Sequence, residues 1–264
     1  MRLCSILFSM LLVATNSVYA HSDVLVRDVA GKVAIGAAAD LGMEEGGPFF
    51  DLETKVFEAV FYNPAAASPP FFYDFERDEP GFFSAPSVPV GTTLPGSADL
   101  TLSLEAFSLG GAHDTTFFWD GSGTVDFQPL AAAQPGVAFT FAPAQFATTD
   151  VFGAVDDHPL FGLTGGAANG VYLSRMRLDV TGLATSDPFY MVWLAHDALV
   201  SEDLAEELEG ALEAFEEGGP APVVAGVDFS FYEEAVEFAE GVPEPSSGLL
   251  VVLALSALAG ISRR

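Results

Sequence analysis

The sequence predicts a mainly β protein, an antiparallel β-sandwich or jelly-roll-like domain. An acidic amphipathic helix near the C-terminus and a hydrophobic C-terminal helix are expected beside it. Several short segments alternate apolar and polar residues with the period of two that marks a half-buried strand. Proline- and glycine-rich stretches separate these segments, and long helical periodicity is absent before about residue 200. This combination is typical of two packed antiparallel sheets.

The strand candidates follow from the alternation. The pattern in 172–180 places Arg175 and Arg177 on the solvent side of a half-buried strand, and the continuous apolar run 189–195 predicts a central strand. The expected strands lie at residues 56–61, 100–105, 137–141, 172–180 and 189–195.

Two glycine-containing turns predict hairpins. Gly31 lies between the apolar segments 23–29 and 33–35, and residues 120–123 lie between Phe-Phe-Trp and Val-Asp-Phe. The second segment lacks the acidic spacing of an EF-hand calcium loop, so a turn is the better interpretation. The acidic and aromatic segment 74–79 admits calcium or sugar contact, although a solvated loop explains it equally well.

Residues 201–217 predict the acidic helix. Ser201 is a suitable N-cap, and residues 218–220 (Gly-Gly-Pro) end the helical pattern. Its apolar stripe consists of Leu204, Leu208, Leu212 and Phe215. We expect this face to pack on the sandwich, with a partner-binding or cation-binding helix as the alternative. A second short helix is expected at 232–240.

Composition excludes several classes of function. The chain has 264 residues and a formal net charge of −28, which disfavours nucleic acid and anionic membrane surfaces as partners. Its single cysteine, Cys4, excludes a disulfide scaffold. The sequence contains no Gly-x-Ser-x-Gly nucleophile motif, no P-loop and no dinucleotide-binding glycine pattern. We therefore expect no catalytic residue and no enzymatic turnover.

The N-terminus has the features of a secretory signal peptide at residues 1–20. Arg2 supplies the positive start, an apolar stretch covers about 6–13, and small residues precede a cut between Ala20 and His21. The apolar stretch is far shorter than the roughly 20 residues of a membrane span. We expect signal peptidase to remove this segment during export.

The C-terminus, residues 242–264, carries three elements in order. Pro243-Glu244-Pro245 precedes an apolar run at 248–261, and Arg263 and Arg264 end the chain. This arrangement resembles the PEP-CTERM sorting signal of Gram-negative bacteria. The resemblance implies handling by an exosortase: an inner-membrane-anchored precursor, held only transiently through 248–261, is cut near the motif. The mature form would then reach the cell surface or the extracellular matrix.

The expected mature part, 21–245, is more acidic than the whole chain. Three of the nine basic residues (Arg2, Arg263 and Arg264) and none of the 37 acidic residues lie outside it, which leaves a net charge of −31. Within it we expect a β-sandwich domain at 21–200 and an acidic helical or β extension at 201–241. A solvated acidic surface is the simplest explanation of the charge, and it also suits divalent cations.

The four histidines are the best candidates for site chemistry. Each of His21, His113, His158 and His196 has an aspartate within two residues, and imidazole with carboxylate suits Zn²⁺ or Cu²⁺. Cleavage after Ala20 would give His21 a free α-amino group, an arrangement that copper-dependent polysaccharide monooxygenases use with one further histidine. The candidate metal ligands are His21 with His113 or His158. No His-x-His pair supports them, so a chain without cofactor (no Zn, Cu or Ca) remains the simpler expectation.

A second resemblance concerns the body of the chain. Its motifs are similar to those of uncharacterised secreted PEP-CTERM proteins of planctomycetes and cyanobacteria. They lie at residues 21–24, 75–82, 158–161, 170–173 and 186–189. Those relatives often carry two or more histidines in the loop that here holds only His158, so the resemblance implies fold rather than metal binding.

These observations favour an exported structural or binding protein of the cell surface or matrix, with extracellular polysaccharide as a candidate partner. The alternatives are a periplasmic or surface metal-binding protein that uses His21, and a secreted polysaccharide-active enzyme. Ligand, oligomeric state and glycosylation stay open at this point.

Overall fold

The computed structural model of the chain describes residues 22–39, 48–64 and 73–242. Strands hold 43% of the described residues and helices 14%, so the fold is mainly β. None of the helices in the described ranges has both the length and the apolar composition of a transmembrane span. The expected signal peptide, its cleavage site at Ala20 and His21, and the expected C-terminal sorting helix all lie outside these ranges.

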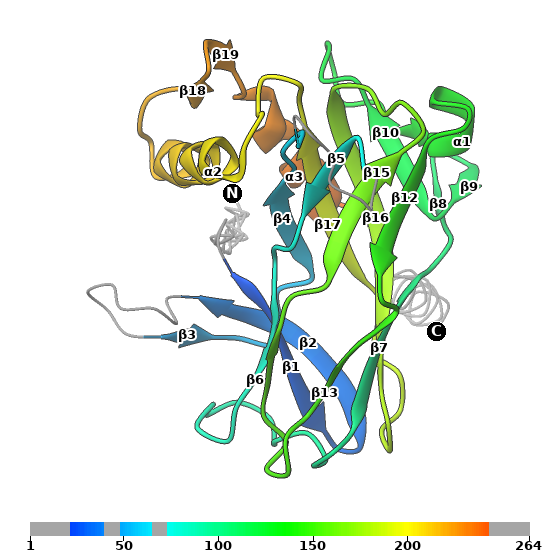
Figure 1. Cartoon of the computed structure of the whole chain (residues 1–264), viewed down its shortest axis with the longest axis vertical. Coiled ribbons are helices and arrows are strands. Elements are labelled where there is room, and N and C mark those ends of the chain that lie inside the picture. Colours follow the sequence, from blue (N-terminus) through cyan, green and yellow to red (C-terminus); the bar gives the residue numbers. More distant parts are fainter. Residues whose placement is uncertain (1–21, 40–47, 65–72, 243–264) are drawn as a thin grey trace, which may run out of the picture.

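A large central sheet organises the molecule (Figure 1). Its long strand β16 pairs along its first half with β10 and along its second half with β7, while β17 covers its other edge. The strands of this sheet are β11 (Gln128–Pro129), β10 (Thr116–Trp119), β16 (Gly170–Val180), β17 (Phe189–Ala195), β4 (Val56–Val60), β7 (Asp99–Leu104) and β13 (Gln145–Thr148). The expected central strand at 189–195 is confirmed as β17, which lies between β16 and β4.

Two smaller sheets and two short ladders complete the β structure. One sheet has the order β14 (Val155–Asp157), β6 (Phe82–Ser84), β1 (Asp23–Val29), β2 (Lys32–Ala39), β3 (Phe49–Phe50). The other has the order β12 (Ala138–Ala142), β15 (Leu160–Thr164), β5 (Phe75–Arg77). The ladders are β8 (Phe107–Leu109) with β9 (Ala112–Asp114) and β18 (Val223–Val224) with β19 (Val227–Asp228). The β1–β2 hairpin turns at Gly31, whose φ of 84° suits glycine.

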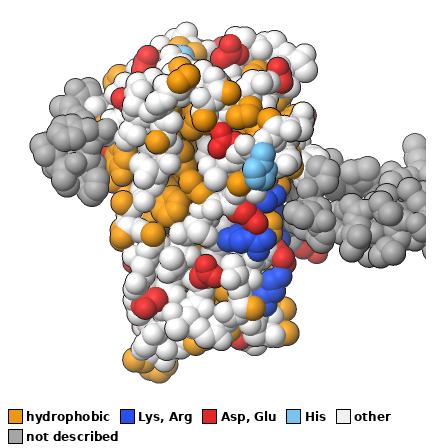
Figure 2. Space-filling model, turned by 90° about the vertical axis from the view of Figure 1, so that its right-hand side faces the viewer, with side chains coloured by type: hydrophobic (Ala, Val, Ile, Leu, Met, Phe, Trp, Pro, Cys, Tyr) orange, Lys and Arg blue, Asp and Glu red, His pale blue; other side chains and the backbone are white. Residues whose placement is uncertain are grey.

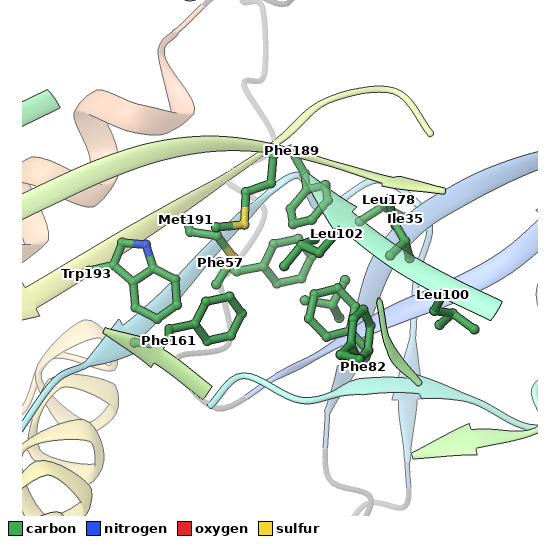
Figure 3. Packing of buried hydrophobic residues seen from close by; sticks show 14 of the residues in the cluster. Ile35, Phe57, Phe82, Leu100, Leu102, Phe161, Leu178, Phe189, Met191 and Trp193 are labelled. Carbon is green, nitrogen blue, oxygen red and sulfur yellow. The ribbon is translucent and has the colours of Figure 1, made fainter. Parts of the chain in front are cut away.

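The two smaller sheets pack on one face of the central sheet. The alternating apolar residues of β16 and β17 point into this aromatic core (Figure 3). Trp193 of β17 lies 4.7 Å from Phe161 of β15 between ring centroids, and Phe189 of β17 meets Phe82 of β6 edge-on at 6.5 Å. These contacts join strands of different sheets, so the core holds the layers together.

Helices cover the opposite face of the central sheet. Helix α2 (Glu202–Glu216) begins where Ser201 Oγ accepts a hydrogen bond from the Leu204 amide, and helix α3 (Phe231–Glu240) follows the β18–β19 ladder. The Tyr232 hydroxyl of α3 donates to the Val192 carbonyl of β17 at 2.7 Å. Apolar residues of both helices form a second core with this face of the sheet. A four-residue helix, α1 (Leu130–Ala133), follows β11.

Two expectations about strand pairing need correction. The sheets are not purely antiparallel, since β1 pairs with β6 and β17 with β4 in parallel. Both pairs join strands far apart in sequence, as parallel pairing requires. The turn after Trp119 does not lead into a strand at 125–127, because β10 pairs instead with Gln128–Pro129. Phe127 is buried between Trp119 and Phe238 instead.

The basic side chains of the described residues are all engaged. Figure 2 shows one side of the molecule, on which basic side chains lie next to acidic ones. The expectation that Arg175 faces solvent is wrong: it is 9% exposed, because its guanidinium packs over the Phe107 ring. The partners are Asp187 for Lys32, Glu209 for Arg77, Glu105 for Arg175 and Arg177, and backbone carbonyls for Arg27 and Lys55.

Candidate metal centre

Three chain segments bring Asp23, Glu79 and His158 together at one end of the β14–β6–β1 ladder. Asp23 begins β1, His158 directly follows β14, and Glu79 lies in the loop before β6. The parallel register pairs Val24 with Phe82, and the antiparallel register pairs Asp157 with Phe82. One step beyond these pairs, Asp23 and His158 both flank Gly81. Strand register therefore places the aspartate and the histidine in one row.

The three side chains lie close to the spacing that a shared cation needs. One ligand atom from each of Asp23, Glu79 and His158 lies within 4.8 Å of the other two. His158 Nδ1 lies 3.4 Å from Glu79 Oε2 and 3.1 Å from the Asp78 carbonyl oxygen. Ligand atoms of one ion at bond lengths of roughly 2.0–2.2 Å lie at most about 4.4 Å apart, so small side-chain movements bring all three within binding distance.

Gly81 makes this close approach possible. A Cβ at this position would lie 2.5 Å from His158 Cε1 and 2.8 Å from Asp23 Oδ1. The Gly81 amide also donates to Asp23 Oδ1 at 3.0 Å and to Glu79 Oε2 at 3.2 Å. Because glycine has no Cβ, the imidazole fits at this position, and the Gly81 amide holds both carboxylates in place by hydrogen bonds.

The electrostatics of the cluster favour a positive charge at its centre. The hydrogen bond to Glu79 raises the pKa of His158 to about 9 against the opposing effect of burial. Burial and the nearby Glu79 raise the pKa of Asp23. Burial raises the pKa of Glu79, but the hydrogen bond and charge of His158 outweigh it and hold that pKa below its usual range. Without a metal, a proton on His158 supplies the positive charge.

A divalent cation can supply the positive charge in place of that proton. Imidazole nitrogen suits zinc, copper, iron and nickel, and carboxylate oxygen is accepted by zinc as well. One nitrogen and two oxygen donors leave a fourth tetrahedral position for water or a ligand. Binding would release the His158 proton, so metal affinity would rise with pH across the range in which His158 titrates.

The other histidines lie apart from this cluster. His113 lies on β9, exposed, with its Nδ1 3.2 Å from Ser108 Oγ. His196 follows β17, accepts the Ala198 amide on Nδ1 and meets the Phe229 ring edge-on, and burial lowers its pKa. His21 lies outside the described residues. Of the expected ligands that the structure describes, His158 joins the metal-type cluster and His113 does not.

Sequence reasoning missed Glu79 and did not connect Asp23 with His158. The sequence places Asp23 near His21, and the structure brings it together with His158 and Glu79. Glu79 ends the acidic segment 74–79, for which the sequence admits calcium or sugar contact. The Pro-Gly that follows it predicts a tight turn, and this was the feature that could have pointed to Glu79. Asp74 of the same segment instead accepts the Gly166 and Ala167 amides.

Comparison with known proteins adds no relative to this picture, because no family model, no curated protein and no solved structure matches the chain.

Proposed function

We propose that this chain is an exported protein of the cell surface or extracellular matrix that binds a divalent metal ion, with zinc as the best fit. The export part of the proposal is supported by the signal-like residues 1–20 and by the PEP-CTERM-like residues 242–264. Signal peptidase and an exosortase would process the two ends. The role is binding rather than turnover, and extracellular polysaccharide is a partner that fits this location.

The cluster of Asp23, Glu79 and His158 is the single observation that carries the metal part. Its donor atoms come from three separate segments and lie within 4.8 Å of one another. Two carboxylates around one imidazole neutralise most of the charge of a divalent ion. Such an ion would cross-link the start of β1 to the loop before β6 and to the end of β14.

His21 extends the proposed site at the sequence level. It precedes Asp23 by two residues and becomes the first residue of the mature chain if cleavage follows Ala20. Its imidazole and its α-amino group are then further nitrogen donors. This version of the site forms only after export, which links metal binding to processing of the N-terminus.

The finer architecture also belongs to this proposal. We take the two smaller sheets and the facing central sheet as a β-sandwich of jelly-roll type. The packing of apolar side chains from all three sheets into one core supports this assignment. The helices on the opposite face are then an extension of the sandwich rather than a separate unit.

Zinc titration of purified variants tests the site. We expect one zinc ion per chain by isothermal titration calorimetry, at least tenfold weaker binding in Asp23→Asn and His158→Gln, and unchanged binding in His113→Gln. Asparagine keeps the oxygen that accepts the Gly81 amide, so Asp23→Asn removes charge without removing that hydrogen bond. Equal zinc affinity in wild type and His158→Gln would contradict the site. Loss of zinc binding in His113→Gln alone would show that zinc binds at His113 on β9 instead.

A further inference from the structure

A buried glutamate lies under the two helices. Glu58 is in β4, on the sheet face that α2 and α3 cover, and it is only 7% exposed. Among the described residues neither of its carboxyl oxygens has a hydrogen-bond partner. Burial of a charged carboxylate without a partner is strongly unfavourable, so this group favours its neutral form.

The groups that face Glu58 increase this preference. Tyr232 of α3 is a buried neutral phenol, and Tyr190 lies on the same face of β17. The acidic groups acting on Glu58 are Glu209 and Glu216 of α2 and Glu233 and Glu240 of α3. The guanidinium of Arg77, in β5, contacts Glu209 at 2.9 Å. Every ionised neighbour from the helices therefore opposes a negative charge on Glu58.

The two helices meet at carboxyl groups. Glu216, near the end of α2, and Glu233, in the first turn of α3, act on each other electrostatically, and each has a buried carboxyl oxygen without a hydrogen-bond partner among the described residues. Two such carboxylates repel each other because both are acceptors only, whereas a proton on one of them can be donated to the other. Burial and the charges of Glu233, Glu213 and Glu240 raise the pKa of Glu216 to about 8. Burial and the nearby Glu237 and Glu240 also raise the pKa of Glu233.

The helix ends add to the same effect. Neither α2 nor α3 has a basic residue in its last turn, although the C-terminus of a helix favours positive charge. Glu213 and Glu216 lie in the last turn of α2, and Glu237 and Glu240 in that of α3. The helix dipoles therefore add to the effects that raise the pKa of Glu216 and of Glu240.

We propose that α2 and α3 form a proton-dependent latch. It is closed on β4 while Glu58, Glu216 and Glu233 hold protons, and it loosens from the central sheet as these groups ionise. A carboxyl whose pKa is higher in the folded state than in the unfolded chain binds more protons when folded. Its stabilising effect is complete below about pH 4.5, the usual value for glutamate, and is lost as the pH rises through its folded pKa, about 8 for Glu216.

Hydrogen exchange read by mass spectrometry at pH 6 and pH 9, corrected for the intrinsic rate, tests the latch. We expect protection of the α2 and α3 amides to fall at least tenfold at pH 9, since one unit of pKa difference corresponds to a factor of ten. The amides of β16 and β17 stay protected. The variants Glu58→Gln and Glu216→Gln cannot ionise and keep the helices protected at pH 9. Glu207→Gln, which removes an exposed carboxylate of α2, behaves as wild type.

Three results would overturn the latch. Protection of α2 and α3 that is equal at both pH values in wild type would show that the helices do not respond to protons. An equal gain from Glu207→Gln would indicate general repulsion of the acidic surface. Full restoration by millimolar calcium of the protection that wild type loses at pH 9 would show that the cluster binds a cation rather than protons.

Discussion

Replacement of Arg77 by methionine perturbs a buried ion pair between β5 and α2. Arg77 Nη2 lies 2.9 Å from Glu209 Oε2, and the two residues are 3% and 4% exposed. Removal of one partner from a buried pair costs about 3–5 kcal/mol. The second contact of Arg77, with Glu202 at 3.8 Å, involves a half-exposed carboxylate and adds less than about 1 kcal/mol. Nearly all of the loss therefore comes from Glu209.

The loss must depend on pH. Burial raises the pKa of Glu209 to about 7, although Arg77 and the Val60 amide lower it. In Arg77→Met the folded pKa of Glu209 rises further, so the buried carboxyl is neutral near pH 6 and expensive to ionise near pH 9. Each unit of pH above the wild-type pKa adds about 1.4 kcal/mol until the variant's own pKa is reached. The free energy of unfolding of the variant is therefore closest to that of wild type at low pH and differs most from it at high pH.

Urea unfolding followed by far-ultraviolet circular dichroism at pH 6 and pH 9 measures this difference. The comparison with wild type at each pH cancels the contribution of the helix latch. The double variant Arg77→Met/Glu209→Gln should recover more than half of the loss at pH 9, because the glutamine carries no charge. Lys32→Met, in an exposed pair with Asp187, is the control and should cost less than about 1 kcal/mol. A loss in Arg77→Met below about 1 kcal/mol at pH 9, or no recovery in the double variant, would refute this reasoning.

The remaining predictions use the same unfolding measurement. Gly81→Ala should destabilise by about 1–3 kcal/mol through overpacking and should abolish zinc binding, since its Cβ meets His158 and Asp23; normal zinc affinity would count against the site. Trp193→Ala should cost about 3–5 kcal/mol, because the ring fills the centre of the aromatic core. Arg27→Lys should cost about 1–3 kcal/mol, since one ammonium cannot serve the separate carbonyls of residues 85, 88 and 90. A cost below about 0.5 kcal/mol in either of the last two would contradict the contacts described here.

The strands that the sequence predicted are those in which local pattern and tertiary environment agree. β16 and β17 are long enough for the alternation in one and the continuous apolar run in the other to be recognised in the sequence. The hairpin of β1 and β2 has a glycine where the turn needs a positive φ. Strands such as β5, β6 and β14 have three residues each, which is too short to reveal a period of two. Their existence follows from pairing with distant strands, which a single sequence does not display.

The burial of charged residues on strands is a second feature that a single sequence does not display. In β4 the residues alternate so that Glu58 points away from the aromatic core, as a solvent-facing residue would. All five residues of β4 are nevertheless buried, because α2 and α3 cover the other face. Arg175 on β16 is buried for a related reason, since Phe107 packs against it. Periodicity identifies the two faces of a strand but not what covers each of them.

The candidate site was only partly accessible to sequence reasoning. His158 was identified from its chemistry, but its partners come from residues 79 and 23, far away along the chain. Asp23 and His158 meet because β1 and β14 both pair with β6. The parallel pairing of β1 with β6 was not expected, so this meeting could not be derived.

Native and denaturing mass spectrometry of the protein recovered from the cell surface or medium tests the account most directly. We predict a chain that begins at His21, ends near Pro243-Glu244-Pro245 and carries one zinc ion in the native spectrum, which is absent from Asp23→Asn. A native mass without metal would contradict the proposed binding role, whatever the ends of the chain are. A surface protein that retains Arg264 would contradict the proposed sorting, whether or not zinc is bound.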